Sequence, residues 1–322
     1  MKRRQILVIA AVTASAIAFG SLPSAAQETV KLAVGQRGNW DTSVPELGKR
    51  AGIFKKHGLE LDILYTQGGG ETQQAVLSGS VDVGVAAGTG GVFGAFSKGA
   101  PVRIIGAQTT GAADYWYVRA DSPLKTIKDA TADTTIAYST NGSSTHTIVR
   151  ALIKQHDLKS KTVATGGPPG TFTQVMSGQI NVGWAAPPFG IDALDQNKIR
   201  IVARGNDLPE IKDQTIRLLI TNVQTLQRRK DVIDRFIQAY RETVDWMYSS
   251  PDVIKEYAQF NNISEDLAKR IRDEFFSKAM LVPDKIQGID ALMEDAVTFK
   301  NIAAPLTKEQ LSELIQIPAP KS

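Results

Sequence analysis

The chain has 322 residues, of which 42% are hydrophobic, with 37 basic residues against 33 acidic ones. Lys2, Arg3 and Arg4 stand in an amino-terminal segment without acidic residues, so the remainder has 34 basic and 33 acidic residues and is nearly neutral. This balance argues against a nucleic-acid-binding surface. The absence of cysteine excludes disulfides and a lipidated amino-terminal cysteine.

Residues 1–26 are predicted to be a secretory signal peptide rather than part of the fold. Three basic residues precede a 14-residue apolar run at 6–19, and Ser24-Ala25-Ala26 provides small residues for cleavage. Fourteen apolar residues are too few to span a bilayer, and no other segment approaches a transmembrane helix. We therefore expect a soluble mature protein that begins at Gln27 and resides in the periplasm.

A segment that occurs twice dominates the rest of the sequence. Residues 55–87 and 154–186 align without a gap at an offset of 99, and 13 of their 33 positions are identical. A period near 100 residues is too long for a solenoid repeat and matches the size of a small domain. The repeat therefore predicts two lobes built on one plan.

Each copy reads as a strand, a helix and a second strand. In the first copy, strands at 61–65 and 81–87 flank a helix at 72–78; in the second, the helix begins after Pro168-Pro169-Gly170 and ends at Gly178. Proline at a helix start and glycine just past its end are the preferred arrangement. Units of this kind predict parallel strands with helices packed on the sheet, an α/β fold.

The remaining elements extend this order on both sides of each copy. A helix at 43–57, ended by Gly58, precedes the first copy, and a helical tail from 230 to 315 follows the last strand. The other predicted elements are strands at 30–34, 102–108, 135–139 and 199–204, with helices at 92–98 and 146–156. The tail has amphipathic spacing and is predicted to cover lobe one.

Two further apolar runs, at 115–119 and 217–222, are predicted to be crossover strands between the lobes. Two such strands between α/β lobes describe a hinge over a cleft. We predict that lobe one comprises residues 27–115 and 219–322, and that lobe two with the hinge strands comprises 116–218.

Ligands of open α/β sheets bind outside the carboxyl ends of the strands. That rule selects three stretches in each lobe, several of which open a helix with Gly, Ser or Thr: 37–40, 68–72, 88–91, 140–145, 167–171 and 187–189. Helix N-termini of this kind bind anions through free backbone N–H groups. Ordinary capping and turn formation would explain each stretch singly, but six stretches converging on one cleft favour a binding site.

The predicted ligand-binding residues follow from these stretches. Arg37 could pair with a carboxylate or sulfonate, and Trp40, Trp184 and Phe189 could stack on the ligand or pack in the core. Acidic side chains could hold an amino group of a zwitterion, although the acid at position 71 could equally complement the helix dipole. The full set is Arg37, Asn39, Trp40, Gly70, Glu71, Thr72, Gly88, Thr89, Asp114, Ser143, Ser144, Thr145, Thr171, Pro187 and Phe189.

Signals for an enzyme are weak. The sequence has three histidines, and two of them, His57 and His156, occupy matching repeat positions at helix ends. No metal-ligand spacing, P-loop or G-x-S-x-G motif is present. We therefore expect no catalytic residues, no metal and no cofactor.

Three segments, GIFKKHGLELDILYTQGGG, LSGSVDVGVAAG and SKGAPVRIIGAQ, resemble the sulfonate, taurine and nitrate group of ABC-transporter solute-binding proteins. That group includes relatives that bind thiamine-pyrimidine precursors. The resemblance implies a two-lobed type II periplasmic-binding fold and delivery of a ligand to a permease in the inner membrane. The cysteine-rich signature of thiamine-pyrimidine synthesis enzymes is absent, since the chain has no cysteine.

The leading hypothesis is a monomeric periplasmic receptor that delivers a small organic anion to an ABC importer. An aliphatic sulfonate or taurine is the first candidate ligand, and an aromatic carboxylate or a pyrimidine precursor is the alternative. Two other functions remain open: an enzyme on the same fold, such as a small-molecule lyase, and a sensor that presents its ligand to a membrane kinase.

Overall fold

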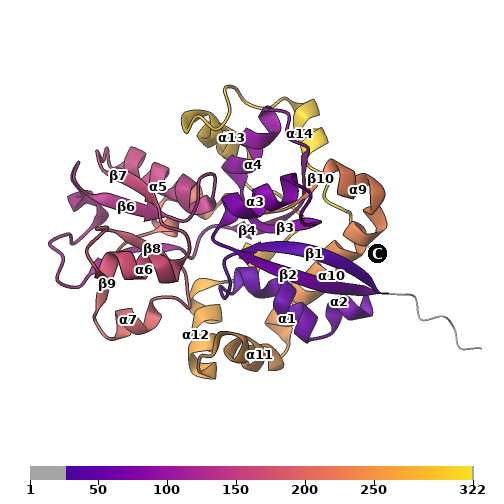
Figure 1. Ribbon diagram of the computed structural model, residues 1–322, viewed down its shortest axis with the longest axis horizontal. Helices are drawn as coiled ribbons and strands as arrows, with labels where there is room; N and C mark the ends of the chain where they lie inside the picture. Colours follow the sequence, from indigo (N-terminus) through magenta and orange to yellow (C-terminus); the bar gives the residue numbers. More distant parts are fainter. Residues whose placement is uncertain (1–26, 321–322) are drawn as a thin grey trace, which may run out of the picture.

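Two β-sheets with the same strand order organise the computed structural model, which describes residues 27–320 (Figure 1). The first sheet has the order β2 (Leu59–Thr66), β1 (Glu28–Gly35), β3 (Val83–Gly88), β10 (Thr215–Asn222) and β4 (Val102–Thr110). Strand β1 runs parallel to β2 and β3, whereas β10 is antiparallel to both of its neighbours. This sheet and the helices packed on it form the first lobe. The predicted signal peptide lies outside the described residues.

The second lobe repeats that arrangement. Three strands have the order β8 (Gly183–Ala185), β5 (Tyr115–Arg119) and β9 (Ile199–Arg204), and β6 (Thr135–Tyr138) pairs in parallel with β7 (Lys161–Ala164). A bridge between Ile136 and Val182 joins the two groups. The resulting order, β7-β6-β8-β5-β9, matches the first sheet, and β5 is again antiparallel to both neighbours. The predicted two-lobed α/β fold is confirmed.

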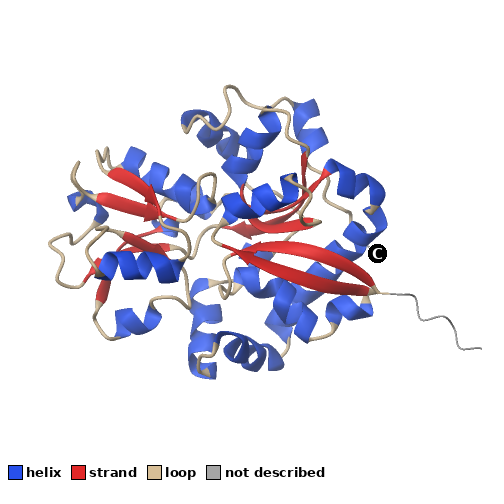
Figure 2. Cartoon of the chain, in the orientation of Figure 1, coloured by secondary structure: helices blue, strands red, loops and turns tan. Residues whose placement is uncertain are grey.

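The two copies of the repeated segment occupy equivalent places in the two lobes. Helix α3 (Gly69–Leu77) and helix α6 (Pro168–Met176) begin and end 99 residues apart, as the sequence offset requires. Each connects an outer strand, β2 or β7, to the strand in the middle of its sheet, β3 or β8. Strand β3 is continuously apolar and buried, and β1 is apolar and buried from Leu32 to Gly35, because helices cover both faces of their sheet, as Figure 2 shows.

The chain passes between the lobes twice, in segments that precede the predicted crossover strands. It leaves the first sheet after Thr110 and enters the second at Tyr115; it leaves the second after Arg204 and returns at Thr215. Strands β5 and β10 therefore lie wholly inside one sheet each, and the predicted second-lobe range 116–218 wrongly includes the start of β10. The same apolar sequence is compatible with a strand that crosses between lobes and with one that pairs inside a sheet. Only the hydrogen-bond partners of the strand distinguish the two.

The predicted helix at 43–57 is broken. A 3-10 turn at Asp41–Ser43 leads into α1 (Val44–Arg50), and α2 (Ile53–Lys56) follows Gly52, whose φ of 73° is left-handed. Glycine adopts this conformation at little cost, so Gly52 ends one helix and redirects the next.

Helices after β10 belong to the first lobe, as predicted for the tail. The long α10 (Lys230–Ser249) packs through Phe236 and Tyr240 on one face of the first sheet, and α13 (Ile289–Thr298) packs on the other face with α4 (Thr89–Ser97). Helices α11 (Asp252–Asn261) and α12 (Glu265–Phe275) lie beside the junction with the second lobe (Figure 1). The remaining first-lobe elements are α9 (Val223–Arg228), the 3-10 helix Lys278–Leu281 and α14 (Lys308–Leu314).

The second lobe has its own core, built around the fully buried Trp116 and Trp184. Its other helices are α5 (Ser144–Gln155), α7 (Ile191–Asp195), α8 (Pro209–Lys212) and the 3-10 helices Ile127–Asp129 and Gly205–Asp207. Within residues 27–320 no helix combines the length and apolarity that crossing a bilayer requires.

Candidate functional site

The loops at the strand ends of the two lobes are in direct contact. The backbone N–H of Gly70 donates to Oγ1 of Thr140 across the interface (3.0 Å), and that of Gly167 donates to Oε1 of Gln67 (3.0 Å). A Cβ at Gly70 would clash with the carbonyl oxygen of Asn141, and one at Gly88 with that of Gly142. The predicted cleft is therefore closed, and glycine at these positions permits the close approach.

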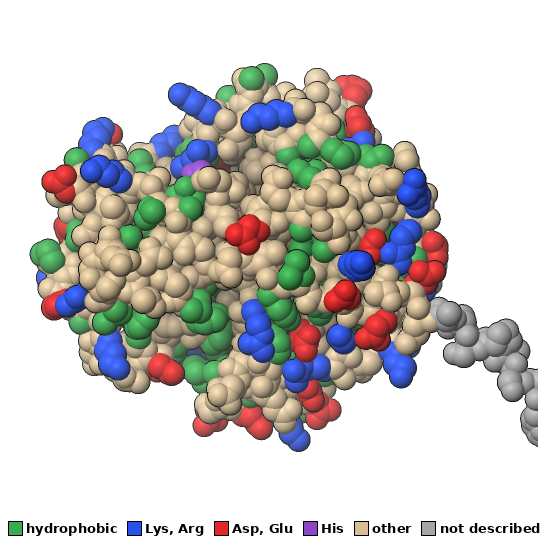
Figure 3. All heavy atoms as spheres, in the orientation of Figure 1, with side chains coloured by type: hydrophobic (Ala, Val, Ile, Leu, Met, Phe, Trp, Pro, Cys, Tyr) green, Lys and Arg blue, Asp and Glu red, His purple; other side chains and the backbone are tan. Residues whose placement is uncertain are grey.

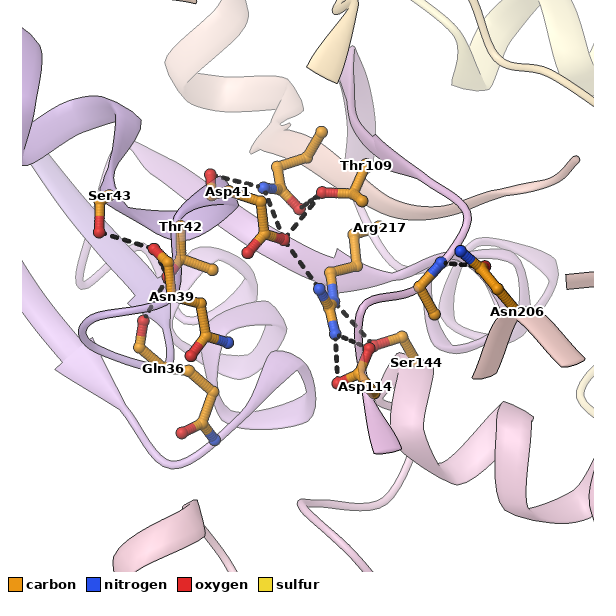
Figure 4. A network of polar contacts seen from close by, with 12 residues as sticks. Gln36, Asn39, Asp41, Thr42, Ser43, Thr109, Asp114, Ser144, Asn206 and Arg217 are labelled. Atoms are coloured by element: carbon orange, nitrogen blue, oxygen red, sulfur yellow. Dashed lines mark hydrogen bonds and ion pairs between the residues drawn. The ribbon is translucent and has the colours of Figure 1, made fainter. Parts of the chain in front are cut away.

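A buried ion-pair cluster lies at the centre of this interface (Figure 4). The Arg217 guanidinium donates from Nη1 to Asp41 (2.8 Å), from Nη2 to both oxygens of Asp114 (2.7 and 2.6 Å) and from Nε to the Ser144 hydroxyl (2.9 Å). Arg217 lies on β10 of the first lobe, Asp114 on the connection between the lobes, and Ser144 at the start of α5 in the second lobe. One side chain thus joins both lobes and their hinge.

The cluster contains one cation and two carboxylates, all buried. Burial raises the pKa of the Asp114 carboxyl, Arg217 lowers it, and Asp41 raises it. Burial also opposes the charge of Arg217, but the two carboxylates outweigh it and raise the pKa of the guanidinium. Because Arg217 is already neutralised by two acids, it is not the charge that would attract an anionic ligand.

A small cavity borders this cluster; we call it the inner cavity. Its volume of about 10 Å³ is close to the space needed by one water molecule. Two buried polar atoms of its wall, Oδ1 of Asn39 and Nε1 of Trp184, have no hydrogen-bond partner among the described residues. The lining is Gly35, Gln36, Asn39, Gly68, Gly69, Ala86, Ser139, Ser143, Ser144, Thr145, Trp184 and Arg217.

A much larger cavity of about 430 Å³, the outer cavity, also lies between the lobes. The first lobe contributes Arg37, Asn261 and Ile263 to its wall. The second lobe contributes Tyr117, Pro168, Pro169, Phe172, Ala185, Pro188, Phe189, Gly190, Asp192 and Ala193. Figure 3 shows a hollow between the two lobes, in the lower half of the view, that hydrophobic side chains border. Sequence neighbours line both cavities: Gln36 and Trp184 the inner one, Arg37 and Ala185 the outer one.

Two polar groups of the outer cavity could hold a ligand. Arg37 is exposed, donates from Nη2 to the Phe260 carbonyl (2.8 Å) and lies 4.2 Å above the Phe260 ring. The Tyr117 hydroxyl is buried and has no hydrogen-bond partner among residues 27–320. Burial raises the pKa of Tyr117, so this phenol stays protonated and can donate.

The structure brings seven of the predicted residues to the two cavities or the ion-pair cluster. Asn39, Ser143, Ser144 and Thr145 line the inner cavity. Arg37 and Phe189 line the outer one, and Asp114 belongs to the cluster. Gly70 and Gly88 form the contact between the lobes.

The other predicted residues have different roles. Trp40 packs in the first-lobe core, where its Nε1 donates to Tyr248 (3.0 Å), so it does not stack on a ligand. Thr89 donates to the backbone of Thr215 (2.6 Å). Glu71 is exposed and accepts from the Gln67 N–H (2.9 Å), which matches its alternative role at the helix start. Pro187 is buried and lines neither cavity.

Thr72 and Thr171 are equivalent residues whose hydroxyls are already bonded. Thr72 Oγ1 lies 2.7 Å from Thr66 Oγ1 and donates to the Gly68 carbonyl. Thr171 makes the same two contacts, with Thr165 Oγ1 at 2.6 Å and the Gly167 carbonyl. Both side chains are fully buried. They hold the strand-to-helix turn of each copy and line neither cavity, so their predicted contact with the ligand stays a prediction.

The sequence prediction missed Asp41, Tyr117 and Arg217. A usable signal existed for Arg217, because a charged residue inside the apolar run TIRLLITN must find a buried partner. For Tyr117 no signal existed, since YWYVR reads as an ordinary buried strand.

Solved structures with this architecture include the alkanesulfonate-binding protein of Xanthomonas axonopodis pv. citri, determined with MOPS bound: TM-score 0.72, 16% identity, over 90% of this chain and 98% of that chain. The nitrate-binding protein of Synechocystis PCC 6803 matches with a TM-score of 0.69 and 12% identity, over 89% of this chain and 86% of that chain. A conserved Candida albicans gene product with the generic periplasmic-binding-protein fold matches with a TM-score of 0.71 and 13% identity, over 92% of this chain and 98% of that chain. At these identities the likeness shows the fold alone, a type II periplasmic-binding-protein fold.

No curated protein sequence matches the chain. The sequence model of the family described as NMT1/THI5 like matches residues 47–254, well over half of the chain. The match spans both copies of the repeated segment and most of both sheets. The chain belongs to the NMT1/THI5-like family.

Proposed function

We propose that this protein is the periplasmic solute-binding component of an ABC importer and that it binds a small organic anion between its two lobes. The observation that carries the proposal is the outer cavity, whose wall comes from both lobes. Its volume of about 430 Å³ lies in the range of small-molecule sites. The inner cavity has room for about one water molecule, so the body of the ligand occupies the outer cavity.

Contacts from both lobes supply the mechanism. A ligand that touches Arg37 of the first lobe and Tyr117 or Phe189 of the second makes all of these contacts only when the lobes are closed. That difference in affinity shifts the population from open to closed. The closed form then presents a surface to the permease that the open form lacks.

Two further points support a receptor. The alkanesulfonate-binding and nitrate-binding proteins that share the fold are named for anionic ligands. Among the described residues no histidine lines either cavity, so the walls lack the commonest general base. The candidate ligands are accordingly aliphatic sulfonates such as taurine and, second, aromatic carboxylates.

Calorimetry and thermal-shift measurements on the chain that begins at Gln27 test the proposal, with alkanesulfonates, nitrate, aromatic carboxylates and pyrimidines as ligands. A true ligand binds one per chain and stabilises the fold by about 2.7 kcal/mol at 100 times its dissociation constant. Small-angle scattering reports whether the ligand closes the lobes. Absence of binding by every class, or chemical conversion of a ligand, would contradict the receptor assignment.

A further inference from the structure

The wall of the outer cavity is unusually rich in rings. Tyr117 and Phe172 lie with their ring centroids 6.3 Å apart and their planes tilted by 38°. Pro168, Pro169 and Phe189 add further flat, rigid surface to the same cavity. Aromatic side chains contact planar rings in offset or edge-to-face arrangements, which a short flexible chain such as taurine cannot use. The wall therefore favours a ligand with an aromatic ring.

Among the described residues Arg37 is the only Lys or Arg in this wall. Its guanidinium is held in place by the Phe260 carbonyl and ring, which use one hydrogen bond and one face of the group. The remaining donors form a planar fork that matches the two oxygens of a carboxylate. Asp192 is the one carboxylate that residues 27–320 contribute to the wall, and it disfavours a second negative charge, so the ligand is a monoanion.

Tyr117 supplies the third requirement. Its side chain is 1% exposed, lines the cavity and carries a hydroxyl without a partner among residues 27–320. The hydroxyl lies beside Gly183 and Val175 and has almost no accessible surface, so a ligand that places an acceptor against this buried donor must shift the Phe172 ring beside it. This acceptor belongs on the aromatic ring of the ligand, because Tyr117 lies among the ring-bearing residues of the second lobe. The carboxylate of the ligand is held at Arg37, which belongs to the first lobe.

We propose that the outer cavity binds a monoanionic aromatic carboxylate, with its carboxylate at Arg37, its ring against Phe172 and Phe189, and a ring hydroxyl or carbonyl at Tyr117. This inference rests on the proposed receptor function and selects the second of its two candidate ligand classes.

Calorimetry with a small panel tests the class of ligand. The panel contains benzoate, the three hydroxybenzoates, benzenesulfonate, cyclohexanecarboxylate and taurine. We expect one hydroxybenzoate to bind most tightly, and cyclohexanecarboxylate and taurine to bind at least about tenfold more weakly. Equal or tighter binding of taurine or an alkanesulfonate would overturn this inference and leave the receptor function intact. Binding of no ligand in any class would count against both.

Three variants test the placement. Tyr117→Phe removes only the hydroxyl, so it should weaken the best hydroxybenzoate about tenfold and leave benzoate unchanged. Arg37→Gln should weaken every anion, and Phe172→Leu should reduce the preference for benzoate over cyclohexanecarboxylate. Tyr240→Phe, at a buried tyrosine in the first-lobe core, is the matched control and should change no affinity. An unchanged ratio of hydroxybenzoate to benzoate affinity in the Tyr117 variant would overturn the assignment.

Discussion

The two copies of the repeated segment differ where the outer cavity is built and agree where the fold is held. The identical pairs Thr66/Thr165 and Thr72/Thr171 make the same hydroxyl contacts in the two lobes. By contrast, the cavity residues Pro168, Pro169 and Phe172 stand at positions where the first copy has Gly69, Gly70 and Gln73.

The chemical difference between the copies has a geometric consequence. Small residues at the start of α3 let the first lobe touch the second, whereas prolines and a phenylalanine on α6 leave a space walled by rings. Identity between the copies therefore reports shared architecture, and divergence between them reports the site. The following predictions break or sharpen that contrast, from the largest expected effect to the smallest.

Arg217→Met tests the cluster that belongs to neither copy. It would leave Asp41 and Asp114 buried without their cation, so the free energy of unfolding should fall by about 3–5 kcal/mol in urea titrations. Arg103→Met, which breaks an ion pair with the exposed Glu313, should cost less than about 1 kcal/mol. A loss below 1 kcal/mol in both variants would show that the cluster does not stabilise the closed fold.

Thr72→Val and Thr171→Val test the equivalence of the identical positions. Each removes one buried hydroxyl together with its bonds to the partner threonine and to a backbone carbonyl, so each should lower the free energy of unfolding by about 1–3 kcal/mol, and by similar amounts. Neither hydroxyl faces a cavity, so ligand affinity should not change. If calorimetry shows weaker binding in either variant, the original assignment of these residues to the ligand is restored.

Gly70→Ala tests the close backbone approach between the start of α3 and the second lobe. The added methyl group would meet the Asn141 carbonyl across the interface, so the lobes should close incompletely and bind an identified ligand about tenfold more weakly, or 1.4 kcal/mol. Gly170→Ala is the matched control in the second copy, because its methyl group has ordinary contacts at 3.7 Å. Equal affinity in the two variants would argue that closure is not required for binding.

His146 gives the smallest effect, through pH. Burial and Arg150 lower the pKa of His146 from 6.5 to about 4, and its Nδ1 accepts from the Gly142 N–H (3.2 Å), which only the unprotonated nitrogen can do. Because the folded pKa is depressed, its contribution is complete above pH 6.5 and is lost as the pH falls toward 4. We expect a loss of about 1 kcal/mol, allowing for partial exposure.

Chemical denaturation between pH 7 and pH 4 measures this loss. His146→Phe keeps a ring to stack on Tyr138, which lies 4.2 Å from His146, and cannot titrate. The wild type should lose more stability than this variant over the same range. Parallel curves would assign the acid sensitivity to other groups.

The sequence by itself determined the two-lobed plan, because strand and helix periodicity and a fixed offset of 99 are local properties of the chain. It also located the loops that meet at the interface, since the carboxyl ends of parallel strands share one edge of a sheet. These inferences required no knowledge of which side chains touch.

Only the tertiary structure decided which of those side chains could reach a ligand. The Trp40 side chain packs in the first-lobe core, and the Thr72 hydroxyl contacts Thr66 on the preceding strand β2. Arg217 and Asp114, which are 103 residues apart in the sequence, meet in one buried cluster. Tyr117 lines the outer cavity because of where β5 lies in its sheet, between β8 and β9. The sequence of β5 does not show this, because a buried strand is apolar on both faces. Side-chain direction at a closed interface depends on partners from distant segments, and a linear pattern does not encode them.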